Sequence, residues 1–391
     1  MKQVALYYPW IYLRGGAERV ILEMVRRSRH SYTVFTNCLD FAQTFPEYRD
    51  LPNLVVLEAV PLERSFGRVL RAAATIARQR LDLQGFDALI VASEGLGDFI
   101  TFRNHSKPVA CVCFTPARPV YDPVYRREWL RRHPLARLPL SLFSLVYAWL
   151  TRRAWRHYRK VFADSAEVRA RILAGRLCPA DKIEVLYPGV DVDTIRPTFT
   201  HDRYFLYAGR IKWTKNVELA IDAFRIFQAE HRMRDWRLVV AGTVDQASSE
   251  YVAWLRARSE PEAVSFIENP TDRELAELYA RCCALLFPPL NEDWGMVPLE
   301  AMAHGKPVLA VLSGGPAESV VDGETGYLLE PSAAAFAAAM ARLAITPALG
   351  ERLGRKAAER AKCFSWDHFV KRLDDYVEDG ATPLDASLVG G

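Results

Sequence analysis

The sequence predicts an α/β protein built from two Rossmann-like, doubly wound domains. Its 391 residues suit two domains of ordinary size, and half of them are hydrophobic, which is enough for sizeable cores. Short apolar runs alternate with helical patterns, which is typical of βα units around a mostly parallel sheet. A stretch with proline and glycine at 187–193 separates two such series, so we place the domain boundary near Arg196.

The first series begins with a strand expected at 4–8 and a loop that reaches Gly15 and Gly16. A helix follows, because apolar residues recur at helical spacing after these glycines. Glycines at a helix N-terminus let a ligand approach the backbone, and the same pair also suits a tight strand-to-helix turn. Further strands are expected at 32–36, 54–57, 88–92, 108–113, 160–164 and 182–186.

Two strand ends in the first domain carry polar residues that suit a binding site. Glu94 follows the strand at 88–92, and Arg118 follows the strand at 108–113. In open α/β sheets ligands bind outside the carboxyl ends of the strands. We therefore expect Glu94 and Arg118 to lie near a bound substrate.

Residues 118–160 combine positive charge with an apolar run. Eleven arginines and lysines stand against Asp122 and Glu128, which leaves a local net charge of +9. The apolar run at 138–150 is shorter than the roughly 20 residues that span a bilayer. The segment suits a helix that lies on anionic lipid, and it also suits a core helix with an arginine-rich solvated face.

In the second series a strand expected at 203–208 leads to Arg210 and Lys215, just before a helix at 217–229. Two cations at the mouth of a βα turn can clamp a diphosphate, because arginine grips it with two hydrogen bonds and lysine adds a point charge. Either cation by itself would be an ordinary surface charge. Other strands of this domain are expected at 236–241, 263–267 and 284–287.

After the strand at 284–287 come a polar loop and a short helix expected at 297–304. Pro298 suits the first helical turn, where its missing N–H has no role, and Gly305 marks the helix end. Free amides at the start of this helix, together with its dipole, form an anion site. The amides concerned are those of Gly295, Met296 and Val297.

Glu292 and Glu300 lie on either side of this anion site. A carboxylate accepts hydrogen bonds and donates none, and a phosphate also offers only acceptors, so the natural partners of both acids are hydroxyl groups. Amides for phosphate beside carboxylates for sugar hydroxyls suit a nucleotide sugar. For Glu300 by itself, an acid that stabilises the first turn of a helix is the alternative.

Glu292 and Glu300 have seven residues between them and are followed by Ala-Met-Ala-His-Gly-Lys-Pro-Val at 301–308. This pattern resembles the E-x7-E signature of glycosyltransferase family 4, whose members are retaining transferases with the GT-B fold. The same stretch, with Ser-Gly-Gly-Pro-Ala-Glu at 313–318, is similar to the mannosyltransferases that build lipid-linked oligosaccharides. The resemblance covers 163–379 strongly and the first half of the chain more loosely.

The resemblance implies two Rossmann-like domains that face each other across a cleft, with a nucleotide diphosphate sugar held mainly by the second. It implies that Arg210 and Lys215 are paired phosphate ligands and that Gly15 and Gly16 lie near the donor phosphates. We therefore expect Arg210, Lys215 and Glu292 to be catalytic, without a metal ion or a further cofactor. The expected donor-binding residues are Gly15, Gly16, Arg210, Lys215, Glu292, Gly295, Met296, Val297 and Glu300.

Phe114 departs from the family pattern, which often has a histidine here beside the transferred sugar. A phenylalanine neither hydrogen-bonds a hydroxyl nor moves a proton. Three explanations remain open: another group takes the role of the histidine, the donor sugar differs, or the alignment with the family shifts by one residue. The expected acceptor-side residues are Glu94, Phe114 and Arg118.

These features favour transfer of mannose from GDP-mannose to a lipid-linked or glycan acceptor, with UDP-glucose or a related UDP-sugar as the alternative donor. Two other classes remain to be distinguished, a GT-B protein that binds a nucleotide sugar without turnover and a membrane-associated scaffold that uses 118–160. A net charge of only +4 argues against nucleic acid as a partner. Seven cysteines and no targeting segment predict a cytoplasmic protein, at the inner face of the membrane where 118–160 would contact anionic lipid.

We expect an N-terminal domain at 1–195 and a C-terminal domain at 196–364. A helix at 365–379 is predicted because its apolar residues fall on one face, and the family fold implies that it joins the first domain. The tail at 380–391 is small and polar enough to be flexible.

Overall fold

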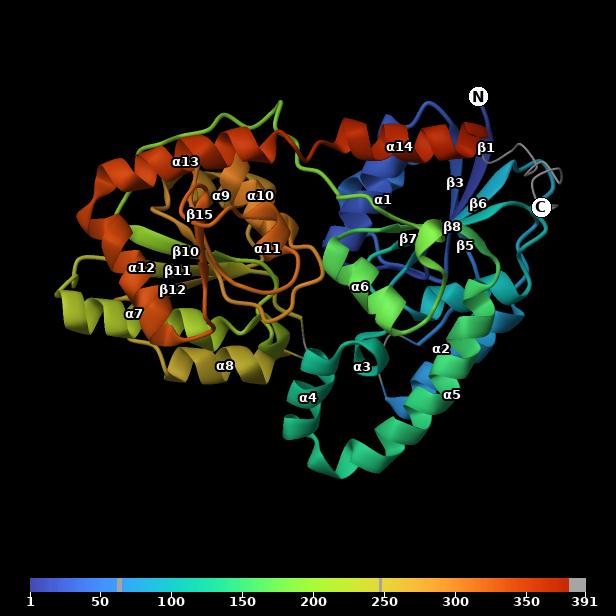
Figure 1. Ribbon diagram of the computed structural model, residues 1–391, viewed down its shortest axis with the longest axis horizontal. Helices are drawn as coiled ribbons and strands as arrows, with labels where there is room; N and C mark the ends of the chain where they lie inside the picture. Colours follow the sequence, from blue (N-terminus) through green and yellow to red (C-terminus); the bar gives the residue numbers. More distant parts are fainter. Residues whose placement is uncertain (62–64, 246–247, 380–391) are drawn as a thin grey trace. The chain divides into compact units, whose positions relative to one another are not determined.

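The structure, a computed structural model, contains two compact units, each with a parallel sheet and helices (Figure 1). The tail at 380–391, expected to be flexible, lies outside the described residues. The structure describes residues 1–61, 65–245 and 248–379.

The division between the units falls after Pro188, ahead of the boundary expected near Arg196. Val190 gives the physical reason, because its amide donates a 3.0 Å hydrogen bond to the carbonyl of Phe364. The chain just after Pro188 is therefore already tied to the second unit. The first unit comprises Met1–Pro188 and the described residues from Trp366 on, and the second comprises Gly189–Ser365.

The first unit is built on a seven-stranded parallel sheet in the order β5-β3-β1-β6-β7-β8-β9. Strand order reverses between β1 and β6, so their carboxyl ends form the switch point of a doubly wound sheet. β6 and β7 are buried along their whole length, as expected for strands covered on both faces. The strands are β1 (Gln3–Tyr7), β3 (Ser31–Thr36), β5 (Leu54–Val56), β6 (Ala88–Ser93), β7 (Val109–Cys113), β8 (Tyr158–Ala163) and β9 (Ile183–Val185), with β2 (Trp10–Ile11) and β4 (Cys38–Leu39) as a separate pair.

The helices of the first unit follow the predicted alternation with strands. The apolar run at 138–150 lies inside one long helix, α5, and the basic residues before it form the shorter α4. The helices are α1 (Gly16–Arg27), α2 (Phe66–Arg78), α3 (Arg118–Tyr121), α4 (Pro123–Arg132), α5 (Arg137–Trp155), α6 (Ala166–Ala174) and α14 (Trp366–Asp379), with 3-10 helices η1 (Pro46–Asp50), η2 (Leu96–Phe102), η3 (Pro134–Ala136) and η4 (Ala180–Lys182).

α14 brings the end of the described chain to the first unit. Ser28 Oγ donates to Asp374 at 2.5 Å, and Arg372 makes two hydrogen bonds to Glu184, at 2.6 and 2.9 Å. These contacts fasten α14 to β9 and beside α1, and Figure 1 shows α14 next to α1. Its apolar face is buried through Trp366, Phe369, Val370, Leu373 and Val377.

The second unit contains a six-stranded parallel sheet in the order β12-β11-β10-β13-β14-β15. The order reverses between β10 and β13, so this unit is also doubly wound. Its strands are β10 (Tyr204–Ala208), β11 (Arg237–Gly242), β12 (Val264–Glu268), β13 (Leu285–Phe287), β14 (Val308–Val311) and β15 (Gly326–Leu329). Its helices are η5 (Trp213–Lys215), α7 (Val217–His231), α8 (Ser249–Ala257), α9 (Asp272–Arg281), α10 (Met296–Ala303), α11 (Pro316–Ser319), α12 (Ala333–Ile345) and α13 (Pro347–Ala361).

Asp98 anchors the end of α5 inside the first unit. Its fully buried carboxylate accepts hydrogen bonds from Trp155 Nε1 at 2.8 Å and from the Tyr158 hydroxyl at 2.7 Å. Burial raises the pKa of Asp98 to about 6, although the two hydrogen bonds oppose the shift. The carboxyl group therefore joins η2, α5 and β8 at one point of the core.

Asp98 should make stability fall as the pH rises from about 4 to about 6. In this window the unfolded chain releases the Asp98 proton and the folded chain retains it, so ionisation favours unfolding. The free energy of unfolding of the wild type, relative to Asp98→Asn, should decrease by up to about 3 kcal/mol across the window. Denaturant titrations at several pH values measure this difference.

Asp87 provides the control with the opposite sign. The Gln3 amide donates to it at 2.8 Å and, with nearby Lys2, lowers its pKa. The wild type relative to Asp87→Asn should therefore gain stability as the pH rises through the acid range. Identical pH trends for the two variants would contradict the role assigned to Asp98.

Candidate functional site

The predicted cations and carboxylates of the second unit lie in loops that leave the same edge of its sheet. β10 and β13 are parallel neighbours, with Leu206 beside Leu285. The loop after β10 carries Arg210 and Lys215, and the loop after β13 carries Glu292. Because both strands end at the same edge, the two loops meet there.

Lys215 and Glu292 are in direct contact. Lys215 Nζ donates to Glu292 Oε1 in an ion pair, and the two side chains are 17% and 13% exposed. Asn216 fastens the same two loops, because its side-chain amide donates to the carbonyl of Pro288 at 3.1 Å. Two of the three residues expected to be catalytic are thus paired at one place.

Arg210 acts on the same point of the site as Glu292. The buried Tyr207 hydroxyl donates to the backbone carbonyl of Arg210 at 2.8 Å. Burial raises the pKa of Tyr207 above its usual value, the Glu292 carboxylate raises it further, and the Arg210 guanidinium opposes both. The charges of Arg210 and Glu292 therefore both reach the same hydroxyl.

α10 begins at Met296, one residue earlier than expected, after Gly295 in a left-handed conformation with φ of 88°. Gly295 occupies the N-cap position and has no side chain that could cap this first turn. A Cβ built at Gly209 would lie 3.9 Å from Val297 Cγ2, so the loop that carries Arg210 packs against the start of α10. The amides of this turn and the predicted cations therefore lie together, which suits an anion.

Glu300 is oriented by Tyr279, which sequence patterns did not single out. The Tyr279 hydroxyl donates to Glu300 Oε2 at 2.8 Å, and its ring stacks on His304 at 5.1 Å between centroids. Burial raises the pKa of Tyr279, and the Glu300 carboxylate adds to the shift. Tyr279 lies in α9 and is 2% exposed, so from the sequence it looks like any core aromatic.

Gly314 and Gly315 hold the backbone of Glu292. The Gly315 amide donates to the Glu292 carbonyl at 2.9 Å, and Gly314 pairs with Glu292 in a β-bridge. A Cβ at Gly314, whose φ is 68°, would lie 2.2 Å from the same carbonyl oxygen. From the sequence this stretch was only part of the family pattern, and the structure adds a close approach that fixes the backbone of Glu292.

Gly15 and Gly16 lie in the first unit, at the start of α1. Gly15 has an ordinary extended backbone, with φ of −117°, so its conformation does not require glycine. A Cβ there would lie 2.4 Å from Oε2 of Glu18, a buried side chain. Packing of Glu18 therefore explains Gly15 without a ligand, which favours the tight-turn alternative, and Gly16 is exposed.

Glu94 and Phe114 follow adjacent strands, β6 and β7, and both neighbour Tyr8. The Phe114 ring is 7% exposed and meets the Tyr8 ring edge-on, with centroids 6.2 Å apart. Burial raises the pKa of Tyr8 and the Glu94 carboxylate raises it further. Arg118 instead forms an ion pair with Asp122 at 2.8 Å, and Asp122 caps α4, so Arg118 has a structural partner.

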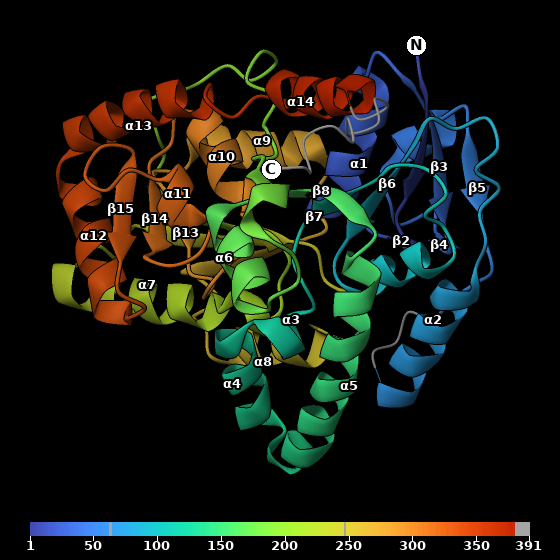
Figure 2. The same cartoon turned by 45° about the vertical axis from the view of Figure 1, so that its right-hand side comes forward.

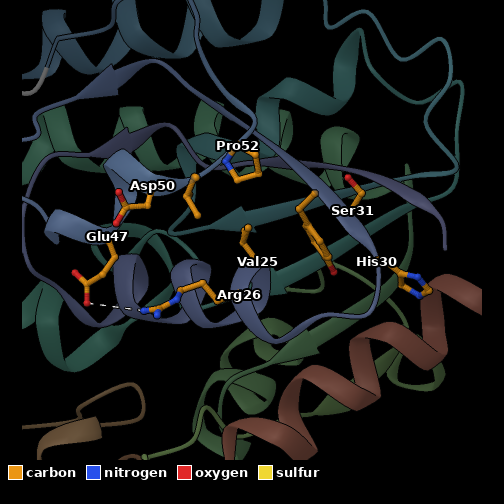
Figure 3. A pocket seen from close by; sticks show the side chains of 9 residues that line it. Val25, Arg26, His30, Ser31, Glu47, Asp50 and Pro52 are labelled. Atoms are coloured by element: carbon orange, nitrogen blue, oxygen red, sulfur yellow. Dashed lines mark ion pairs between the residues drawn. The ribbon is translucent and has the colours of Figure 1, made fainter.

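A pocket of about 250 Å³ lies elsewhere in the first unit, between α1 and η1 (Figure 3). Arg26 and Glu47 approach each other to 3.9 Å at its edge. It contains none of the residues that the sequence predicted for a site. We therefore assign function to the charged loops of the second unit rather than to this pocket.

Metal sites and membrane spans are two further features that would bear on function. Within the described ranges, no group of three or more His, Cys, Asp or Glu side chains is arranged to hold a metal ion. No single helix in the described part of the chain is long and apolar enough to cross a membrane, and α12 with α13 passes that test only as a pair bent by 105°.

Two family models match consecutive parts of the chain. Glycosyltransferase Family 4 matches residues 14–194, and Glycosyl transferases group 1 matches 193–360. The alpha-1,3/1,6-mannosyltransferase ALG2 of Homo sapiens is 29% identical over 93% of this chain and 92% of its own length. The alg-2 protein of Neurospora crassa is 27% identical over 93% and 88%. The D-inositol 3-phosphate glycosyltransferase of Streptomyces avermitilis is 31% identical over 53% and 49%.

Solved structures agree with the chain over nearly its whole length. Anabaena Alr3699/HepE in complex with UDP and glucose has a TM-score of 0.74 at 16% identity, covering 97% of this chain and all of its own. Sucrose-phosphate synthase from Thermosynechococcus elongatus has a TM-score of 0.75 at 18% identity, covering 97% and 99%. The GT-B fold predicted from the sequence is thereby confirmed.

Gly314→Ala should lower the free energy of unfolding by about 2 kcal/mol or more, because the new methyl group would meet the Glu292 carbonyl and the backbone is left-handed. Gly323→Ala is the matched control, since Gly323 has φ of 72° and open space around it. It should lose only about 1 kcal/mol, the conformational part. Denaturant titration measures both, and equal losses would contradict the close approach.

Proposed function

Because this chain belongs to glycosyltransferase family 4, we propose that it moves a hexosyl group, with mannose from GDP-mannose favoured, to a lipid-linked or glycan acceptor. The chain is an enzyme of the glycosyltransferase type with the GT-B fold. The observation that carries the donor assignment is the set formed by Arg210, Lys215, Glu292 and Glu300 around the start of α10. The similarity to alpha-1,3/1,6-mannosyltransferases over nearly the whole chain supports mannose as the transferred sugar.

The phosphate end of the donor is assigned to the cations and the first turn of α10. Arg210 and Lys215 neutralise the charge that grows on the leaving diphosphate, and preorganised charge of this kind usually contributes more to catalysis than any other single effect. The amides at Gly295 to Val297 add hydrogen bonds to the same oxygens. To reach a phosphate, Lys215 exchanges its contact with Glu292 for one with the donor.

The two carboxylates are assigned to hydroxyl groups. Glu300, held by Tyr279, accepts hydrogen bonds from the ribose, and Glu292 accepts from the transferred sugar. Release of Lys215 to the phosphate would leave Glu292 available for that sugar. This division agrees with the positions of the two acids, because Glu292 lies in the loop before α10 and Glu300 lies within α10, beyond the first turn where the sequence had placed it.

We assign a retaining, metal-independent reaction. The acceptor hydroxyl attacks the anomeric carbon on the face from which the diphosphate departs, and its proton passes to a leaving phosphate oxygen as the carbon–oxygen bond to phosphate breaks. Arg210 and Lys215 supply the positive charge that a metal ion provides in other transferases. No cofactor besides the nucleotide sugar is needed for this step.

On the acceptor side, Glu94 and Phe114 are assigned to contacts near the incoming hydroxyl. Gly15 and Gly16 remain candidates for the donor phosphates, with the packing of Glu18 as the competing explanation. We place the enzyme in the cytoplasm at the inner face of a membrane, where a lipid-linked acceptor would be available.

A panel of donors tests the proposed function. Thermal shifts would be measured with GDP, UDP and ADP and their common sugars, with and without a chelator. A ligand at about 100 times its dissociation constant adds about 2.7 kcal/mol, so the true donor should be visible. We expect GDP and GDP-mannose to give the shift and turnover to be insensitive to the chelator. A shift only with UDP compounds would move the assignment to a UDP-sugar, the ligand class present in the HepE structures.

Lys215→Ala should lower turnover about 100-fold or more, because it removes positive charge at the leaving group. It should also lower the free energy of unfolding by about 1–3 kcal/mol, because Glu292, whose side chain is only 13% exposed, loses its paired charge. Lys362→Ala, which breaks an exposed ion pair with Glu359, should change neither. Steady-state rates and denaturant titrations on the same preparations separate the two effects. A loss of activity no larger than the loss of folded protein would contradict the role of Lys215 at the leaving group.

Tyr279→Phe should weaken GDP binding about fivefold, because Glu300 loses the hydrogen bond that orients it towards the ribose. Affinity for 2′,3′-dideoxy-GDP, which lacks the ribose hydroxyls, should not change. Tyr204→Phe is the control. The Tyr204 hydroxyl donates to the carbonyl of Leu278 in α9, the helix that carries Tyr279, and not to Glu300. Calorimetric titration measures these affinities, and equal weakening for both nucleotides would contradict a role through the ribose.

A further inference from the structure

α5 has two apolar faces, of which only one is buried. Its inner face, which includes Tyr147 and Trp155, packs into the core of the first unit. The sequence left open a core helix with an arginine-rich solvated face, and the structure shows instead that the middle of the solvated face is apolar. Its exposed side chains are Leu138 at 80%, Leu142 at 65%, Leu145 at 72%, Val146 at 51% and Trp149 at 51%.

α2 continues this apolar surface. The ring of Phe66 in α2 lies 5.7 Å from the ring of Phe143 in α5, so the two helices are in contact, and both views show them side by side (Figures 1 and 2). Phe66 and Leu70 are 39% and 55% exposed. A continuous surface of this kind marks a site of interaction rather than scattered exposed residues. We call it the α2–α5 face, made of Phe66, Leu70, Leu138, Leu142, Leu145, Val146 and Trp149.

Among the described residues, neither α2 nor α5 carries an acidic side chain. Neither 65–81 nor 129–160 contains an aspartate or a glutamate. The Arg153 guanidinium lies 3.6 Å from the centroid of the Trp149 ring, so one cation is held at the edge of the apolar stripe. Exposed arginines on the two helices are Arg68, Arg71, Arg78, Arg137, Arg152 and Arg153.

Charge decides which partner fits. A second copy of the chain would bring the same arginines against themselves, and like charges oppose such a contact. An anionic bilayer offers negative headgroups for the arginines and an acyl boundary for the leucines and Trp149. The combination of an apolar centre with basic residues around it therefore fits a lipid surface.

We propose that the α2–α5 face docks the protein on an anionic bilayer. The inference deepens the proposed function and rests on it, since docking would bring the enzyme to a lipid-linked acceptor. The leucines and Trp149 enter the headgroup boundary while the arginines contact lipid phosphates. The helix stays folded in the first unit through its inner face, so docking needs no unfolding.

Vesicle flotation of the full chain tests the docking, with phosphatidylcholine vesicles that either contain or lack phosphatidylglycerol. The wild type should float with the anionic vesicles and less with the neutral ones. Leu142→Ser with Leu145→Ser should lower the partition coefficient about 10-fold or more, because apolar burial is lost without a change in charge. Arg137→Gln with Arg152→Gln should lower binding to anionic vesicles only, and salt should mimic this change.

Leu312→Ser with Ile345→Ser is the matched control, since these residues of the second unit are 56% and 62% exposed. This variant should float like the wild type. Failure of the wild type to float, or unchanged flotation of the Leu142 and Leu145 variant, would overturn the docking proposal. A wild-type dimer in sedimentation that the same variant converts to a monomer, without vesicle binding, would also overturn it and assign the face to a second copy.

Nucleotide binding by the same variants separates this proposal from the proposed function. Thermal shifts with GDP should be the same for the wild type and all three variants, because none of the changed residues belongs to the donor site. If the variants changed on the α2–α5 face lose flotation and still bind GDP, the docking face is confirmed and the donor assignment is unaffected. If the wild type floats with vesicles but binds no nucleotide, the proposed function is contradicted and the docking proposal stands.

Discussion

The parallel pairing of β10 with β13 is the constraint on which the candidate site depends. Lys215 and Glu292 are 77 positions apart in the sequence, and they meet because both loops leave the sheet at the same edge. β14 pairs in parallel with β13 and adds a third loop there, which brings Gly314 against the backbone of Glu292. If any of these strands ran in the opposite direction, its loop would lie at the far edge and the set would not assemble.

Sequence patterns predicted most of the sheets because buried parallel strands appear as short apolar runs between helical patterns. The strand expected at 88–92 is Ala88–Ser93, and the strand expected at 203–208 is Tyr204–Ala208. β14 and β15 were not predicted, since apolar runs of only three or four residues can belong to a strand or to a loop. The resemblance to family 4 and the GT-B fold, both predicted from the pattern around Glu292, are confirmed.

The charged residues of the site could be found from the sequence because charge in a loop after an apolar strand is unusual enough to notice. Tyr279 and Tyr207 could not, since each is a buried aromatic whose hydroxyl has a role only through a partner that the sequence pattern does not reveal. Arg118 was predicted as a site residue, and its engagement with Asp122 depends on a helix cap that composition does not reveal. The donor, the acceptor and independence from metal remain predictions.

The ion pair between Lys215 and Glu292 has a thermodynamic consequence. A ligand that recruits Lys215 gains only the difference between the new contact and the one it replaces, so this lysine contributes less to affinity than an unpaired cation would. When Lys215 moves to the ligand, Glu292 loses its partner. A ligand that also donates hydroxyl hydrogen bonds to Glu292 replaces that lost contact. Under the proposed donor assignment, the site therefore favours a nucleotide that carries its sugar over the same nucleotide without it.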